Sequence, residues 1–302
     1  MAATKDCSKT AIARPGAHDP FGPGTDESGD TGRTVMGRIA AIMEAFDQGE
    51  QVLSLVELSQ RAHLPKSTVH RLAEQMRTIG WLERDYNGYR IGMRLFELGG
   101  LALQRNQLRD TAFPHLYALA GKTGLAVQLG VLDRGEVVYL ERVVVDGFRL
   151  PTRLGGRMPA YCTGLGKSML AFDDSAAEAV LGSELRRRTE NTITEPDLLR
   201  SNLAQVRTSG VAFDLNECAE GLGCVAAPIR NSGRAIGAVS VTGPFTRIDW
   251  DAASEAVQHT ATNIWNARFG APRSARTVSD GRRRHGAAKV ARTVPSPEIE
   301  AS

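Results

Sequence analysis

The order of elements expected in residues 34–92 constrains the fold more than any other feature of this sequence. Apolar residues recur at helical spacing in three short successive segments. The second segment opens on a capping-box pattern, in which Ser54 and Glu57 each bond the backbone amide of the other. We expect Pro65 at the first position of the third helix, where a missing amide loses no helical hydrogen bond.

A hairpin signal follows the third helix. Asn87 and Gly88 separate two strand-like runs within residues 81–91, and a two-residue turn of this composition is expected to place both at positive φ. Three short helices and a tight hairpin are the layout of a winged helix-turn-helix. We therefore predict such a domain over residues 34–92, mostly α with a β-hairpin wing.

The third helix is the candidate DNA reader of this domain. A buried stripe through Val69, Leu72 and Met76 leaves a polar face outside, and an exposed helix face fits the major groove of DNA. Hydroxyl groups at its amino end and polar groups on the wing suit phosphate oxygens. The candidate DNA contacts are Lys66, Ser67, Thr68, His70, Arg71 and Gln75 on the helix, and Arg84, Tyr86, Asn87 and Arg90 on the wing. One helix alone would indicate only a solvated polar face, but the ordered combination favours double-stranded DNA as partner.

The rest of the chain predicts a second domain over residues 108–270. Strands are expected at 125–132, 136–144, 148–153, 211–216, 223–230 and 234–242, and helices at 109–122, 164–172, 175–182, 195–208 and 249–269. The strands cluster in two groups with helices between them, which favours α+β with an antiparallel sheet. A linker helix over 93–107 carries apolar groups on more than one face, and a second subunit is a candidate to cover them.

The two ends of the chain differ from its middle in composition. Residues 1–33 form a polar arm and residues 271–302 a basic tail, and both are too poor in large apolar groups to fold alone. The chain carries a net charge of +3, with an excess of four positive charges in the tail. We favour a solvated tail over one that adds phosphate attraction.

The composition excludes several classes of protein. No apolar run is long enough for a membrane helix, and the first thirty residues lack the apolar core of a signal peptide. Four cysteines without paired spacing are typical of free thiols in a reducing cytoplasm. These features predict a cytoplasmic protein with no membrane partner.

Four segments resemble the IclR-type family of bacterial transcriptional regulators. The reader-helix segment 64–72 matches the family's DNA-binding domain, and 158–171, 210–228 and 238–244 match signatures of its second domain. The resemblance covers residues 34–269. It implies a two-domain regulator, acting as a repressor, with a GAF-like domain that binds an organic or aromatic acid. It also implies a dimer or a dimer of dimers.

The resemblance also implies where the effector binds. The matching positions are Gly164, Leu165, Asp214, Leu222, Cys224, Ser240 and Thr242. Backbone amides near Gly164, before a helix, suit a carboxylate. Asp214 would oppose a carboxylate, so we expect it to meet a hydroxyl, an amine or an aldehyde hydrate, or to be protonated. Leu165 is bulkier than the residue in some members, which disfavours the smallest acids.

Other chemistries are less well supported. A phosphate-binding loop ending at residues 166–168 would need a glycine where Tyr161 stands, so we expect no nucleotide and regard Lys167 as a structural or surface lysine. Three cysteines of the second domain lack the paired spacing of a zinc site, and we expect neither metal nor cofactor. The alternative function is an enzyme with Cys162 or Cys224 as nucleophile.

Overall fold

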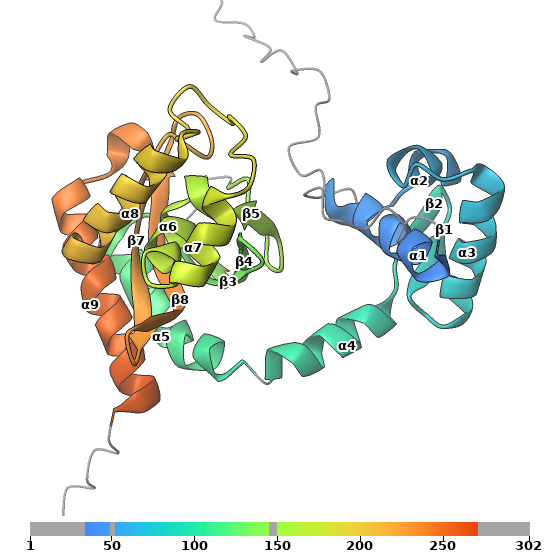
Figure 1. The fold of residues 1–302 in the computed structure, drawn as a ribbon. Coiled ribbons are helices and arrows are strands. Elements are labelled where there is room, and N and C mark those ends of the chain that lie inside the picture. Colours follow the sequence, from blue (N-terminus) through green and yellow to red (C-terminus); the bar gives the residue numbers. More distant parts are fainter. Residues whose placement is uncertain (1–33, 49–51, 105, 145–149, 271–302) are drawn as a thin grey trace, which may run out of the picture. The chain divides into compact units, whose positions relative to one another are not determined.

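The structure is a computed structural model that describes residues 34–48, 52–104, 106–144 and 150–270. The predicted arm and tail lie outside these ranges. The N-terminal part contains three helices, a short 3₁₀ turn and a hairpin (Figure 1). Their bounds are α1 Val35–Glu44, η2 Ala45–Gln48, α2 Leu55–Arg61, α3 Lys66–Thr78, β1 Leu82–Asp85 and β2 Gly88–Ile91.

This N-terminal part has a hydrophobic core of its own, to which α1, α2, α3 and the hairpin each contribute. Ile42, Leu58, Leu72 and Tyr89 are fully buried in it. The predicted capping box of α2 is present: the Glu57 amide donates to Ser54 Oγ, and the Ser54 amide donates to Glu57 Oε2 at 2.8 Å. The winged helix-turn-helix prediction is confirmed.

Two local predictions in this part were wrong. Pro65 is the N-cap of α3, because its carbonyl accepts from the Val69 amide at 3.0 Å and its ψ of 139° is extended. The two residues of the hairpin turn are Tyr86 and Asn87, not Asn87 and Gly88. Neither Asn87 nor Gly88 has a positive φ.

Gly88 is required for a different reason from the one predicted. It is the first residue of β2, and a Cβ atom there would lie 2.1 Å from the Leu53 carbonyl oxygen. Leu53 bridges the next residue, Tyr89, through two backbone hydrogen bonds. The glycine therefore lets the chain before α2 pack directly on the wing.

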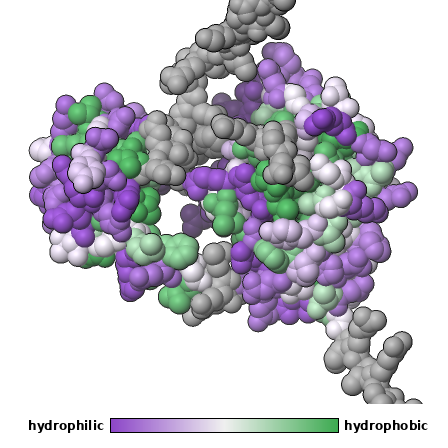
Figure 2. All heavy atoms as spheres, turned by 180° about the vertical axis from the view of Figure 1, so that it is seen from behind, coloured by the Kyte–Doolittle hydropathy of each residue, from purple (hydrophilic) through white to green (hydrophobic). Residues whose placement is uncertain are grey.

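Two consecutive helices connect the N-terminal and C-terminal parts of the chain. They are α4, Met93–Gln104, and α5, Gln107–Thr123. Helix α4 leaves four large apolar side chains exposed, those of Met93, Phe96, Leu98 and Leu101. Elsewhere, hydrophilic side chains cover much of the surface seen in Figure 2, with smaller hydrophobic groups between them.

The C-terminal part is built on one six-stranded, fully antiparallel sheet of order β5-β4-β3-β8-β7-β6. The strands are β3 Ala126–Asp133, β4 Glu136–Val143, β5 Arg157–Pro159, β6 Ala212–Leu215, β7 Leu222–Asn231 and β8 Arg234–Pro244. The helices and turns are η3 Ala160–Cys162, α6 Gly164–Leu170, α7 Asp174–Leu181, α8 Pro196–Ser209, η4 Phe245–Arg247 and α9 Trp250–Phe269. This confirms the predicted α+β class.

The strand predicted at 148–153 was wrong where the structure describes it. Residues 150–153 are not in a strand, and 145–149 lie outside the described ranges. Pro151 has no amide to donate to a sheet. The edge strand β5 comes later, at 157–159, after a turn in which Gly155 has φ +70°.

Helices cover both faces of the sheet (Figure 1). Helices α5 and α9 pack on one face and form one buried core with Leu129, Val225 and Val241. Helices α6, α7 and α8 lie on the other face, and their core includes Tyr139, Cys224 and the start of α6. The candidate effector residues belong to this second face.

Candidate DNA-binding surface and effector pocket

Helix α3 presents the predicted polar face to solvent. Val69, Leu72, Ala73 and Met76 point into the core of the N-terminal part. Of the predicted DNA contacts on this helix, Thr68 is half-buried and the rest are exposed, namely Lys66, Ser67, His70, Arg71 and Gln75. One uninterrupted helix face therefore offers cationic, amide and hydroxyl groups together.

The wing carries three of its four predicted contacts at or near the turn. Tyr86 and Asn87 form the turn itself and are exposed. The Arg84 guanidinium lies 4.8 Å from the centre of the Tyr89 ring, a cation–π contact, and it forms no ion pair with the described residues. Tyr89 also donates to Glu74 of α3 at 3.1 Å, which ties the wing to the reader helix.

Arg90, the fourth wing residue, is already paired. Its guanidinium lies 2.8 Å from Glu83 and 3.7 Å from Asp85. Two carboxylates therefore compete with any phosphate for this side chain, which makes Arg84 the better phosphate contact of the two.

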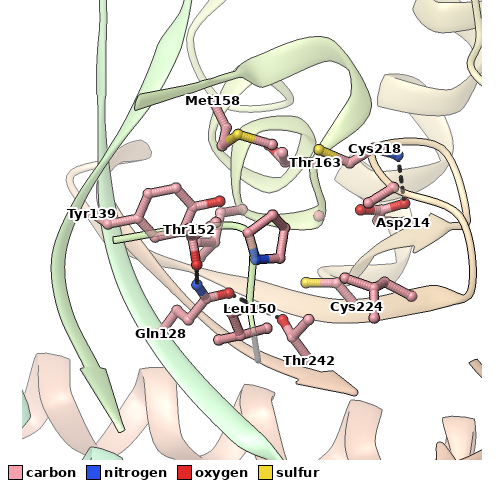
Figure 3. A pocket seen from close by; sticks show the side chains of 15 residues that line it. Gln128, Tyr139, Leu150, Thr152, Met158, Thr163, Asp214, Cys218, Cys224 and Thr242 are labelled. Carbon is pink, nitrogen blue, oxygen red and sulfur yellow. Dashed lines mark hydrogen bonds between the residues drawn. The ribbon is translucent and has the colours of Figure 1, made fainter. Parts of the chain in front are cut away.

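A pocket opens on the α6 face of the C-terminal sheet (Figure 3). We call it the effector pocket. Its walls come from all six strands of the sheet, the loop after β6, the start of α6 and the segment before β5. It is lined by Gln128, Tyr139, Leu150, Pro151, Thr152, Met158, Thr163, Gly164, Leu165, Asp214, Cys218, Ala219, Leu222, Cys224 and Thr242.

Six of the seven predicted effector residues line this pocket. Strand register explains why three of them meet: Thr242 pairs with Cys224, and Cys224 pairs with Asp214, in one row across β8, β7 and β6. Gly164 packs directly against this row, since a Cβ atom at Gly164 would lie 2.9 Å from Cys224 Sγ.

Ser240 is the predicted residue that does not line the pocket. It shares a strand face with Thr242, as expected, but it is fully buried one row further along β8, opposite Ala226. Helix α6 begins directly over Ala226, so the helix covers this row. The Ser240 hydroxyl makes no hydrogen bond with any residue that the structure describes.

Asp214 is a buried acid held by backbone amides. Its Oδ1 accepts from the amides of Glu217 at 2.7 Å and Cys218 at 3.2 Å. Burial, with a smaller contribution from the Glu217 carboxylate, raises the Asp214 pKa to about 7. Near neutral pH this side chain is therefore present in both protonation states.

Lys167 proves to be the structural lysine of the two alternatives. It is fully buried, and its Nζ lies 2.5 Å from Glu217 Oε1. This pair anchors α6 to the loop after β6, the loop that also supplies both amides to Asp214. A nucleotide phosphate has no access to this ammonium group.

The cysteines of the C-terminal part are buried thiols. Burial raises the pKa of Cys224 to about 12, and contact with Cys162 together with burial raises that of Cys218. His115 and His259 lie on α5 and α9, which cover the opposite face of the sheet. Neither of these two histidines therefore stands beside the thiols. Among the described residues no group of three His, Cys, Asp or Glu could hold a metal ion.

Sequence reasoning missed the Tyr139 and Gln128 side of the pocket. Tyr139 reaches it through a β-bulge: Leu129 pairs with Glu141 but Gly130 pairs with Tyr139, so Leu140 is the extra residue. The bulge turns Tyr139 onto the pocket face. Gln128 had a usable signal, because it is a large polar residue inside the apolar run 125–132.

Comparison with known proteins decides the family. The model of the bacterial transcriptional regulator IclR C-terminal domain matches residues 100–266, and that of the IclR helix-turn-helix domain matches residues 36–86. The chain belongs to the IclR family. It is a DNA-binding transcriptional regulator rather than an enzyme, which removes the cysteine-nucleophile alternative.

Curated and solved relatives agree with this assignment. The chain is 34% identical to the HTH-type transcriptional regulator KdgR of Escherichia coli, over 81% of this chain and 95% of that one. It is 32% identical to the E. coli transcriptional repressor IclR, over 71% and 81%. An IclR homolog from Microbacterium hydrocarbonoxydans, solved in complex with 4-hydroxybenzoate, is 30% identical with a TM-score of 0.69, covering 78% of this chain and 98% of that one.

The described part of this IclR-family chain contains no helix that is both long and apolar enough to cross a membrane.

Proposed function

We propose that this IclR-family regulator is a repressor whose affinity for its operator is controlled by a small organic acid, most specifically an aromatic hydroxy acid. The effector pocket is the observation that supports this. It combines a few polar groups with an apolar wall, the composition of a small-molecule site. The similar Microbacterium protein, which was solved with 4-hydroxybenzoate, points to the same class of ligand.

We assign DNA reading to residues 34–92 and effector sensing to residues 108–270, with 93–107 as linker. The hydrophobic cores of the two parts support this division, since each draws on residues of its own part. The DNA contacts we propose are those on α3 and the wing, with Arg90 the weakest. The proposed effector contacts are the six predicted residues that line the pocket. Ser240 is buried in the adjacent row of the sheet and does not contact the effector in this proposal.

We further propose a two-fold dimer. The exposed apolar side chains of α4, at Met93, Phe96, Leu98 and Leu101, support this, because a second copy would cover them. A two-fold dimer reads two half-sites separated by one or more helical turns of DNA. The effector would then act by shifting an equilibrium between dimer geometries.

The test is DNA binding by the full chain, with a fragment of its own upstream DNA, measured by fluorescence anisotropy with and without 4-hydroxybenzoate. We expect specific binding that weakens as the acid is added. A panel of other small carboxylic acids serves as the comparison. Specific binding that no acid in the panel changes would contradict the proposed control by an organic acid, and absence of specific binding would contradict the assigned DNA surface.

A further inference from the structure

Two of the polar groups that line the effector pocket lie on different strands of the sheet. The first, which we call the amide group, is Gln128 on β3 with Thr152 and Thr242 (Figure 3). Gln128 Nε2 donates to Thr152 Oγ1 at 2.5 Å, and Thr242 Oγ1 donates to Gln128 Oε1 at 3.1 Å. The second group is Asp214 on β6, with strands β8 and β7 between it and β3. The pocket therefore has two chemically different poles.

The amide group is suited to an anion. A glutamine amide has two N–H donors, and only one of those on Gln128 is used, by Thr152. Gln128 is buried and lines the pocket, so a molecule bound there can supply an acceptor for its second N–H. The Arg142 guanidinium donates to the Thr152 carbonyl and places a positive charge beside this pole.

The Asp214 pole is suited to a hydroxyl. Backbone amides occupy Oδ1, while Oδ2 accepts no hydrogen bond from the residues described in the structure. Glu217, whose amide donates to Oδ1, carries a second carboxylate close by. Lys167 pairs with Glu217, but no cation pairs with Asp214 among the described residues, so a ligand carboxylate placed here would meet the Asp214 carboxyl group. A hydroxyl, by contrast, can hydrogen-bond to Asp214 in either protonation state.

Most of the remaining lining is apolar, apart from the hydroxyl groups of Tyr139 and Thr163. Leu150, Met158, Leu222 and Cys224 contribute side chains without a charged group, and Tyr139 adds its ring. Such a wall suits a flat hydrocarbon body.

We propose that the effector pocket fixes the orientation of a hydroxy-carboxylate, with the carboxylate on the amide group and the hydroxyl on Asp214, and that Gln128 is the specificity-determining residue for the carboxylate. This rests on the proposed function and deepens it. It also moves the carboxylate away from the start of α6. That helix has only seven residues, and the Gly166 amide in its first turn is already bonded to Thr163 Oγ1.

The experiment is calorimetric titration of the full-length protein with three probes: 4-hydroxybenzoate, benzoate, which lacks the hydroxyl, and phenol, which lacks the carboxylate. Gln128→Met removes the amide at similar size. We expect this substitution to lower the affinity for 4-hydroxybenzoate and for benzoate by roughly 10- to 100-fold, the range for a lost hydrogen bond to a charged group. The affinity for phenol should not change. Asp214→Ala, which removes both carboxyl oxygens, should instead weaken binding of the hydroxyl-bearing probes relative to benzoate.

Two further variants keep the test decisive. Gln128→Glu retains the acceptor for Thr242 but adds a negative charge. It should therefore also weaken binding of the two carboxylates and leave phenol binding unchanged. Gln258→Met, the same substitution as the first on α9 at the opposite face of the sheet, should bind all three probes like the unchanged protein. Thermal unfolding of each variant shows that it is folded.

The outcomes separate this proposal from the proposed function. An equal loss of affinity for all three probes in Gln128→Met, or a loss of affinity for phenol alone, would overturn the proposed orientation. A wild-type protein that binds none of the probes would overturn it as well. If the unchanged protein releases DNA in response to an acid while both Gln128 variants respond normally, the orientation fails and the proposed function stands. If the probes show the expected pattern but no acid changes DNA binding, the proposed orientation stands and the proposed function fails.

Discussion

At the scale of single residues, Arg71 is the side chain of α3 best placed to read a base. It is exposed in the middle of the outward face and forms no ion pair with the described residues. We expect Arg71→Ala to weaken operator binding by about 1–3 kcal/mol and to relax sequence preference at one position. Anisotropy titrations with operator and scrambled DNA measure both, and Arg200→Ala on α8 controls for loss of charge. Unchanged affinity and preference would show that Arg71 reads no base.

The two wing arginines are expected to differ. Arg84→Ala should weaken binding to every DNA sequence and reduce the salt dependence by about one unit of slope, as loss of one phosphate contact does. Arg90→Ala should have a smaller effect, because Glu83 and Asp85 already neutralise that guanidinium. Salt titrations of both variants test this, and an equal change in slope would mean that Arg90 leaves its carboxylates on binding DNA.

Asp214 should make stability depend on pH. Its folded-state pKa of about 7 lies above the usual value of 3.8, so its contribution to stability is full below pH 4 and is lost as the pH rises towards 7. We expect Asp214→Asn to remove that decline, which is on the order of 1–4 kcal/mol. Denaturant unfolding between pH 4 and 8 measures it. Parallel curves for the two proteins would show that the acid is ionised throughout.

Residue chemistry could be predicted from the sequence more readily than residue position. A simple charge argument led to the prediction that Asp214 is protonated or meets a hydroxyl, an amine or an aldehyde hydrate, and its raised pKa agrees with the first of these. The absence of Ser240 from the pocket could not be predicted, because it depends on where α6 crosses β7 and β8. Period-two alternation gives the face of a strand but not the row that a helix covers.

At the scale of elements, the packing of the wing on Leu53 depends on Gly88. We expect Gly88→Ala to destabilise the N-terminal part by at least about 2 kcal/mol, because the added Cβ atom meets backbone that cannot rotate away. DNA binding should fall while 4-hydroxybenzoate binding persists. Thermal unfolding gives the loss, and Asn87→Ala in the exposed turn is the near-neutral control. A stable Gly88→Ala protein would mean that the Leu53–Tyr89 bridge is dispensable.

A second element-scale prediction concerns the joint between β4 and α5. Arg142 holds the Thr152 carbonyl, its own amide donates to Glu141 at 3.0 Å, and Glu141 pairs with Arg109 in the first turn of α5 at 2.6 Å. This chain leads from the pocket wall to the helix that follows α4. We expect Glu141→Gln to bind effector normally but to reduce the effector's influence on DNA affinity several-fold.

The measurement for Glu141→Gln is the ratio of DNA affinities with and without 4-hydroxybenzoate. Glu178→Gln, which removes an exposed partner of Arg200, is the matched control. A full response in Glu141→Gln would show that this joint carries no signal.

Element type and order could largely be predicted, whereas element junctions could not. Helical and strand periods located nearly every element of the C-terminal part, since each pattern reports burial on one face. The bulge at Leu140 and the late start of β5 arise from how strands meet their neighbours. Nothing in the local sequence around Tyr139 encodes that register.

At the scale of the whole molecule, the family signatures indicated DNA binding more clearly than the composition did. A net charge of +3 says little about DNA, because the sensing part is neutral and dilutes any basic surface. The cationic and amide groups that we propose to read bases occupy one face of α3. Their grouping became visible only through the buried stripe on the other side of α3.

Because helices cover both faces of the sheet, its backbone amide protons should exchange with solvent slowly. Amide protons in β3, β8 and β7 are bonded to strands on either side and lie beneath a helical layer above and below. Exchange with solvent there requires opening both layers at once, so these protons should outlast all others. Helix α4, by contrast, has no buried side chain among those described, so in an isolated subunit its amides should exchange early. The regulator would then combine a slow, rigid sensor with a fast connecting element.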